Sequence, residues 1–273
     1  MKCFFAVAVA CVCLLLVGCS PEGSSCFSRG CTSCKTEPAC VAPATSDDDA
    51  PSDDVAGSVV EEVAVSVADE PATVAEVAEE KAWMPLFDGE STAGWSIPVY
   101  GGDGAVDVQE GNLVLGRGDM MTGIRYEKEF PKINYEIQYE ARRTEGYDFF
   151  AACTFPVNDS FCTFVNGGWS GGVIGLSSIN GYDASENPTT DYYEFKSEIW
   201  YRFRISVTND QIQVWITPQD KEGNWGEEKR CVNVELDEET ELSTRMEANL
   251  YKPLGFCTYA TVGQLRNIVY RSH

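Results

Sequence analysis

Apolar and polar residues alternate with a period of two through much of the chain after residue 82. The clearest stretch is INYEIQYEAR, residues 133–142, which places Ile, Tyr and Ala on one face and Asn, Glu, Gln and Arg on the other. A similar stretch at 201–207, a turn at Asn209-Asp210 and apolar positions 212, 214 and 216 predict a hairpin, and residues 106–109 and 113–115 predict another. Many short strands without a long helical period predict an all-β, two-sheet antiparallel sandwich over residues 82–273.

The first 19 residues follow a different pattern. Lys2 precedes an apolar run over residues 3–17, which is shorter than the roughly 20 residues that a membrane span needs. The run ends LVGCS, which resembles a bacterial lipobox with Cys19 as the lipid-modified residue. Each buried lipid CH₂ contributes about 0.8 kcal/mol, so several acyl chains anchor a protein firmly. We therefore expect a lipid-anchored protein on the periplasmic or extracellular side of a bacterial envelope; the alternative is an ordinary cleaved signal that ends in a cysteine.

Residues 20–81 lack any apolar period. Cys26, Cys31, Cys34 and Cys40 lie among Ser, Gly, Thr and Pro, and their C-x4-C-x2-C start matches part of an iron–sulfur pattern. A structural zinc site is an alternative, whereas disulfides of undetermined pairing are favoured in an exported protein. Residues 41–80 carry many Asp and Glu but no Lys, Arg or aromatic residue, which predicts a disordered acidic linker.

Composition narrows the function classes. The net charge is −23, which argues against a nucleic-acid partner because phosphate binding needs basic patches. The single histidine is His273, so a Ser-His-Asp triad, a Cys-His pair and a histidine-ligated zinc are excluded. The 12 cysteines are typical of an exported protein.

Candidate binding groups concentrate in residues 159–190. A Gly-rich loop surrounds Trp169, and a second polar loop contains Tyr182, Asp183, Glu186 and Asn187. An aromatic ring, carboxylates and an amide are groups that hold a sugar, although Gly, Asn and Asp also supply ordinary turns. Asp183 and Glu186 could bind calcium through oxygen atoms, but they lack the EF-hand spacing, so we expect no metal or other cofactor.

Cys153 and Cys162 bracket a short polar segment. If the turn centres on residues 157–158, the two cysteines lie opposite each other at a Cα distance of about 5 Å, which a disulfide can span. The alternative is two buried thiols that act as small apolar side chains.

Three groups of motifs stand out after residue 82: WMPLFDGESTAGW at residues 83–95, IWYRFRI at 199–205 with IQVWI at 212–216, and KPLG at 252–255 with LRNI at 265–268. Together they resemble the 3-keto-disaccharide hydrolase domain family, which has a concanavalin-like lectin/glucanase fold. The resemblance implies a hydrolase or lyase acting on 3-keto-glycosides, in which a base removes the C2 proton and a cation stabilises the enolate. It suggests Asp183 or Glu186 as the base and Arg142 as the stabilising group. Residues 167–187 depart from the family's usual pattern.

Two other functions remain. A two-carboxylate glycosidase would need carboxyl groups roughly 5.5 Å or 6.5–9.5 Å apart. Glu136 and Glu140 share a strand face but lie about 13 Å apart, with Gln138 between them, so we expect a solvated polar face instead. A non-catalytic glycan-binding or scaffold module would use Trp169, Tyr182 and Asn187 for its carbohydrate ligand.

Overall fold

The computed structural model describes residues 81–273. The signal segment with Cys19, the four clustered cysteines and the acidic linker lie outside the described residues, so the expectations about them, including the boundaries of the segments, stay predictions. Within residues 81–273, no helix is long and apolar enough to cross a membrane.

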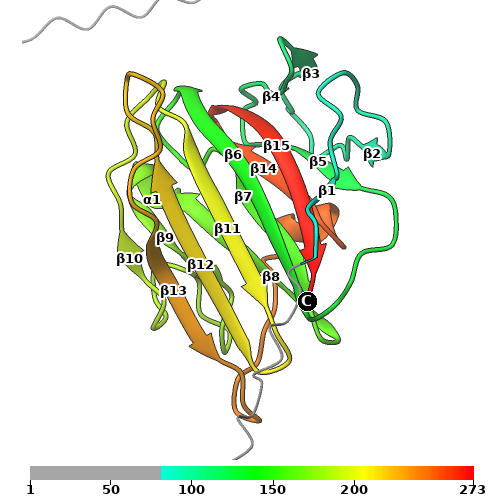
Figure 1. Cartoon of the computed structure of the whole chain (residues 1–273), viewed down its shortest axis with the longest axis vertical. Coiled ribbons are helices and arrows are strands. Elements are labelled where there is room, and N and C mark those ends of the chain that lie inside the picture. Colours follow the sequence, from blue (N-terminus) through cyan, green and yellow to red (C-terminus); the bar gives the residue numbers. More distant parts are fainter. Residues whose placement is uncertain (1–80) are drawn as a thin grey trace, which may run out of the picture. The chain divides into compact units, whose positions relative to one another are not determined.

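One sheet has eight antiparallel strands and faces the viewer in Figure 1. The order of its strands is β13 (Lys229–Glu235), β12 (Gln211–Pro218), β11 (Tyr201–Val207), β6 (Tyr135–Glu145), β15 (Val262–Ser272), β4 (Asn112–Leu115) and β3 (Val106–Gln109), with β1 (Met84–Pro85) also paired to β15. Both hairpins expected from the sequence are present, as β3–β4 and β11–β12.

The second sheet has seven antiparallel strands and lies behind the first in Figure 1. Its order is β10 (Asp191–Tyr192), β9 (Val173–Ser177), β8 (Ser160–Gly167), β7 (Ala152–Val157), β14 (Gly255–Tyr259), β5 (Met121–Tyr126) and β2 (Trp95–Ser96). Two short helical turns accompany the strands, α1 (Gly168–Gly171) and the 3₁₀ turn η1 (Glu247–Tyr251).

The chain crosses repeatedly between the sheets, because β5, β7 and β14 of one sheet alternate along the sequence with β4, β6, β11 and β15 of the other. This alternation makes a jelly-roll sandwich and confirms the expected fold class. Side chains from the facing sides of the two sheets fill the space between them. The rings of Tyr139, Phe203 and Phe256 are fully buried and pack together there. The ring centroid of Tyr139 lies 5.1 Å from that of Phe203 and 4.8 Å from that of Phe256.

The strand pattern read from residues 133–142 is confirmed in β6. Tyr135, Ile137, Tyr139 and Ala141 are all fully buried in the core. The intervening residues therefore point outward, from the eight-stranded sheet, and this decides where Arg142 lies.

Of the two alternatives for Cys153 and Cys162, the structure shows the second, because both residues are free buried thiols. The β7–β8 turn lies one residue later than expected, because Val157 pairs with Ser160. Cys162 therefore lies opposite Phe155, and Cys153 lies opposite Phe164. Both thiols join the hydrophobic core, which is the alternative that the sequence had left open.

Candidate functional site

A pocket of about 350 Å³ opens on the outer face of the seven-stranded sheet. Its floor spans neighbouring strands, with Ser177 on β9, Thr163 on β8, Ala152 on β7 and Cys257 on β14. These side chains are small and point away from the core, so they leave an open space above the middle strands of the sheet, and this space is the pocket. The floor is therefore a consequence of strand alternation combined with side-chain size.

Larger side chains surround this floor. Trp169, Tyr100, Phe149 and Tyr259 supply aromatic surface to the pocket. Trp169 is 43% exposed, because it lies in α1, directly after the end of β8. A flat aromatic surface beside polar groups suits a sugar ring, which has one apolar and one hydroxylated aspect.

Arg245 is the central charged group of the pocket wall. Its Nη1 atom forms an ion pair with Asp183, and its Nε atom lies 3.5 Å from Oε2 of Glu247. Burial opposes the charge on the guanidinium, but the two carboxylates outweigh burial and raise the pKa of Arg245 above its ordinary value. Arg245 is therefore a fixed positive charge, with a pocket carboxylate next to it.

Asp183 holds Arg245 in place. Its Oδ1 accepts hydrogen bonds from the hydroxyls of Ser177 and Ser178, at 3.0 Å and 3.1 Å. Ser177 belongs to β9, so the chain of contacts from Ser177 through Asp183 to Arg245 ties the charge to the sheet.

A second carboxylate of the pocket, Asp148, is engaged by backbone N–H groups. Oδ1 accepts from the backbone of Phe149 at 2.8 Å, and Oδ2 accepts from the backbone of Ser170 at 3.0 Å. Asp148 therefore fixes the backbone next to Trp169.

The structure brings some of the residues chosen from the sequence to this pocket. Trp169 lines it, and Asp183 lies at its edge through Arg245 and Ser177. Tyr182 and Glu186 are exposed on the loop beyond Asp183 and are not among the residues that line the pocket.

Asn187 is a structural residue of that loop. Its amide group donates to the backbone carbonyls of Leu176, Tyr182 and Asp183, and the side chain is 7% exposed. These bonds hold the loop next to β9. The amide has only two hydrogens and three carbonyl acceptors within reach, so neither hydrogen is left to donate to a ligand. The turn interpretation of Asn187 is the one that its contacts support.

Arg142 lies on the opposite side of the sandwich. It points outward from β6 of the eight-stranded sheet, where its guanidinium lies 4.8 Å from the ring centroid of Trp200 and donates to Gln264 at 2.8 Å. The expected convergence of Arg142 with Asp183 and Glu186 is therefore wrong, because strand alternation turns Arg142 away from the core and the pocket beyond it.

The expectation of a solvated polar face around Glu136 and Glu140 is also wrong. The two side chains are only 4% and 3% exposed. Glu140 accepts from Arg202 at 2.9 Å and from Arg266 at 2.8 Å, and Asn267 donates to it as well. Paired arginines cover both carboxylates and take the place of water.

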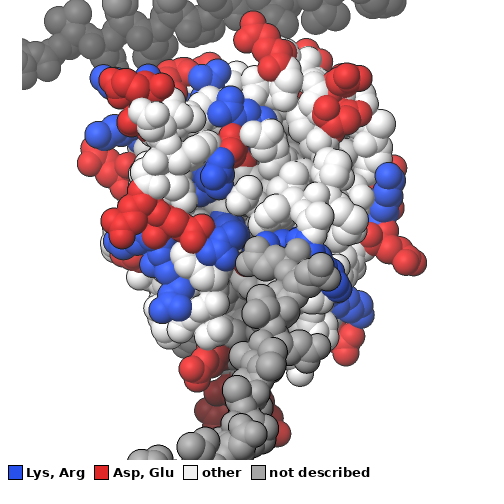
Figure 2. Space-filling view, in the orientation of Figure 1, with Lys and Arg blue, Asp and Glu red and all other residues white. Residues whose placement is uncertain are grey.

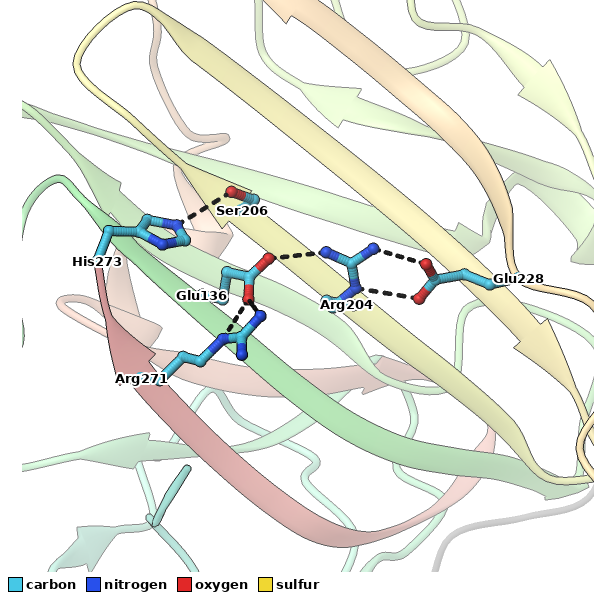
Figure 3. A network of polar contacts seen from close by, with 6 residues as sticks. All are labelled: Glu136, Arg204, Ser206, Glu228, Arg271 and His273. Carbon is cyan, nitrogen blue, oxygen red and sulfur yellow. Dashed lines mark hydrogen bonds and ion pairs between the residues drawn. The ribbon is translucent and has the colours of Figure 1, made fainter. Parts of the chain in front are cut away.

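Figure 3 shows the equivalent network at Glu136, which accepts from Arg204 at 2.7 Å and from Arg271 at 2.6 Å. Arg204 also forms a bidentate ion pair with Glu228, in which Nε donates to Oε1 at 3.0 Å and Nη2 donates to Oε2 at 2.6 Å. We call this outer surface of the eight-stranded sheet the arginine face; Figure 2 shows basic side chains grouped across it. Its arginines are Arg142, Arg202, Arg204, Arg266 and Arg271.

The three charged residues that line the pocket, Asp148, Arg245 and Glu247, were not identified from the sequence. Arg245 and Glu247 flank Met246 just before and within η1, in a segment without strand or helix periodicity. Only the tertiary fold brings this segment over β14 and β5. Within residues 81–273, no three His, Cys, Asp or Glu side chains gather closely enough to hold a metal ion.

Comparisons with known proteins place this geometry in context. The sequence profile of a family described as "3-keto-alpha-glucoside-1,2-lyase-like domain" matches residues 82–219. A comparison with curated proteins found no match.

Solved structures with a similar fold include lectins and a glycoside hydrolase. The VIP36 exoplasmic/lumenal domain, in a form bound to Ca²⁺ and Man3GlcNAc, is 8% identical with a TM-score of 0.47, covering 71% of this chain and 91% of that one. The seed lectin of Lotus tetragonolobus is 10% identical with a TM-score of 0.44, covering 68% and 95%. The catalytic domain of a glycoside hydrolase family 131 protein from Coprinopsis cinerea is 10% identical with a TM-score of 0.35, covering 59% and 70%. At this level of similarity none of the three informs the chemistry of the pocket.

Proposed function

Because the chain belongs to the 3-keto-alpha-glucoside-1,2-lyase-like domain family, we propose that it binds a 3-keto-glycoside in the pocket of the seven-stranded sheet and eliminates its C1 substituent. Family membership supports a carbohydrate-related function. The reaction and its residues are the proposal, since Arg245 and Glu247 lie beyond the matched range of 82–219.

The observation that carries the proposal is the placement of Arg245 beside Glu247 in the wall of an aromatic-lined pocket. A ketone at C3 of a sugar acidifies the proton on C2. Elimination then needs a base for that proton and a positive charge near the C3 oxygen. A carboxylate 3.5 Å from a fixed guanidinium supplies both groups.

In the proposed reaction, Glu247 takes the C2 proton and the electrons of the C2–H bond form an enolate, with its oxygen facing Arg245. The enolate then collapses, a C1–C2 double bond forms and the C1–O bond breaks. The departing alkoxide takes the proton from Glu247 and leaves as the alcohol, so the carboxylate is regenerated and the sugar remains as an unsaturated ketone. Asp183 acts as a positioning residue for Arg245, while Trp169 and Tyr259 orient the ring.

A pair of nitrophenyl substrates tests the reaction. The full chain is incubated with 4-nitrophenyl 3-keto-α-glucoside and with 4-nitrophenyl α-glucoside, and nitrophenol release is followed together with the sugar product by mass spectrometry. We expect release from the keto substrate only, with an unsaturated ketone as co-product. Release from neither, combined with sugar binding by saturation-transfer NMR, would identify a glycan-binding module; equal release from both would identify an ordinary glycosidase.

Anchoring at the bacterial envelope is a further part of the proposal. Cys19 would carry the lipid, and the acidic segment of residues 41–80 would join it to the sandwich. The LVGCS sequence supports this arrangement. Replacing Cys19 by Ala should move the protein from the detergent phase to the aqueous phase in a Triton X-114 partition, and an unchanged partition would contradict lipid attachment.

A further inference from the structure

A second hollow, of about 530 Å³, adjoins the pocket across the short α1 segment. Trp169 faces the pocket, whereas the next residues, Ser170 and Gly171, line the hollow. Tyr147 and Tyr192 add aromatic surface to the hollow and are 65% and 73% exposed. Consecutive residues of α1 therefore line the two depressions.

Arg143 is the buried charge of this hollow, and it is only 8% exposed. Its Nη2 atom donates to the carbonyl of Phe195 at 2.7 Å. The Nε and Nη1 atoms have no hydrogen-bond partner among residues 81–273. A buried guanidinium with unused N–H groups is unfavourable, because each group has lost water without gaining a replacement.

No carboxylate among residues 81–273 forms a direct ion pair with the guanidinium of Arg143 that would neutralise its charge. Burial lowers the pKa of the guanidinium, and Tyr201 and Asp148 act in the opposite direction. Asp148 already accepts two backbone hydrogen bonds. Glu194 also lines the hollow and is exposed to solvent. A buried cation of this kind favours an anionic partner over a neutral one.

The backbone above Arg143 adopts strained conformations. Trp169 and Ser170 both have positive φ angles, of 48° and 72°, and a left-handed conformation is unfavourable for a non-glycine residue. Gly171 follows with φ at 107°, and a Cβ atom there would lie 2.4 Å from the carbonyl oxygen of Tyr147 and 3.3 Å from Nη1 of Arg143. Only glycine allows this close approach, and strain of this kind is concentrated at functional segments.

We propose that the hollow is a subsite for an acidic sugar unit, whose carboxylate or sulfate group pairs with Arg143 while the neighbouring unit occupies the pocket. The ring would lie against Tyr147 and Tyr192. Because Gly171 lies against Nη1, the Ser170–Gly172 backbone shifts outward when the anion binds. That the ligand is a sugar rests on the proposed function; that it is anionic rests on Arg143.

Three monosaccharides test the subsite with the full chain. Methyl β-D-glucuronide, glucose 6-sulfate and methyl β-D-glucoside are titrated separately and followed by NMR, and dissociation constants are compared. We expect at least one acidic sugar to bind tenfold or more tightly than the neutral glucoside, with the two acidic probes distinguishing carboxylate from sulfate. No preference for either acidic sugar would overturn the proposal.

Two variants separate the subsite from general electrostatics. Arg143→Met should abolish the preference for acidic sugars and leave binding of the glucoside unchanged. Glu194→Gln, at an exposed position, should strengthen binding of the acidic sugar several-fold without affecting the neutral one. If Arg143→Met does not fold, the Glu194→Gln result decides, and an unchanged preference in that variant would contradict the subsite.

These measurements are independent of the nitrophenyl assay, because none of the three ligands carries a C3 ketone. Failure to release nitrophenol with a preserved preference for acidic sugars would reject the elimination reaction alone. Turnover of the keto substrate with no acidic preference would reject the subsite alone.

Discussion

The outer faces of the two sheets carry similar residue types but use them differently. On the arginine face, Glu136 and Glu140 are buried and each is paired with two arginines. On the seven-stranded sheet, charges are few, the strand residues are small and the arginine of the pocket wall is half exposed. On the arginine face, the carboxylates are paired with arginines within the protein. On the seven-stranded sheet, the small strand residues leave space for a ligand, and the half-exposed Arg245 offers it a positive charge.

The difference shows that a group of charged side chains indicates a binding site only when the groups it already pairs with inside the protein are known. The carboxylates of β6 have the more conspicuous spacing in the sequence, yet their oxygens are occupied by guanidinium groups. Arg–Trp stacking completes the arginine face, with Arg204 lying 3.7 Å from the ring centroid of Trp215 and Arg202 4.1 Å from that of Trp225. We therefore assign stability to one face and chemistry to the other.

The strongest test of this division replaces one carboxylate on the pocket wall. Glu247→Gln should lower the rate of nitrophenol release from the keto substrate about 100-fold or more, because the amide cannot accept the C2 proton. The matched control is Glu186→Gln, an exposed acid that does not line the pocket. Similar losses in the two variants would contradict a specific role of Glu247, and loss only in Glu186→Gln would place the base on the loop beyond Asp183.

The arginine face should respond in stability and not in turnover. Glu140→Gln leaves Arg202 and Arg266 without their shared carboxylate, and we expect the free energy of unfolding to fall by about 3 kcal/mol, the lower end for breaking a buried ion pair. Urea denaturation measures this change. Glu198→Gln, which removes an exposed carboxylate 3.5 Å from Arg142, should cost less than about 1 kcal/mol. Equal costs would mean that burial of Glu140 adds nothing.

Alkaline pH tests the buried thiol Cys162 on the inner side of the seven-stranded sheet. Burial raises the pKa of Cys162 from 9.0 to about 12. Between these values the unfolded chain loses a proton that the folded chain keeps, so stability falls by about 1.4 kcal/mol per pH unit for each such thiol. Cys162→Ala should be less stable than the parent at pH 8, and the gap should close between pH 9 and 12. A constant gap in urea denaturation would show that Cys162 ionises equally in both states.

The strands can be predicted from the sequence because their side-chain pattern is local, whereas the pocket cannot, because its residues are brought together only by tertiary packing. Alternation at residues 133–142 predicts which side chains of β6 enter the core, and Tyr135, Ile137, Tyr139 and Ala141 are all fully buried there. It does not predict which outer face a strand contributes to, because that depends on how strands far apart in the sequence, such as β6, β11 and β15, are assigned to the two sheets. Trp169 was identified from its Gly-rich surroundings, which do form a strained loop. Arg245 and Glu247 had no such signal, because η1 is placed by tertiary packing and its sequence lacks strand periodicity.

Arg142 provides the smallest expected effect and the sharpest check on the assignment of the two faces. Its guanidinium stacks on Trp200, donates to Gln264 and lies 3.5 Å from an exposed carboxylate. Contacts of this kind contribute about 1 kcal/mol or less at partly exposed positions, so Arg142→Ala should lower the melting temperature by a few degrees. Turnover of the keto substrate at 25 °C should be unchanged, because the whole core separates Arg142 from the pocket. A loss of turnover comparable to that of Glu247→Gln, with stability preserved, would mean that the substrate binds on the arginine face and that the division of roles between the two sheets is reversed.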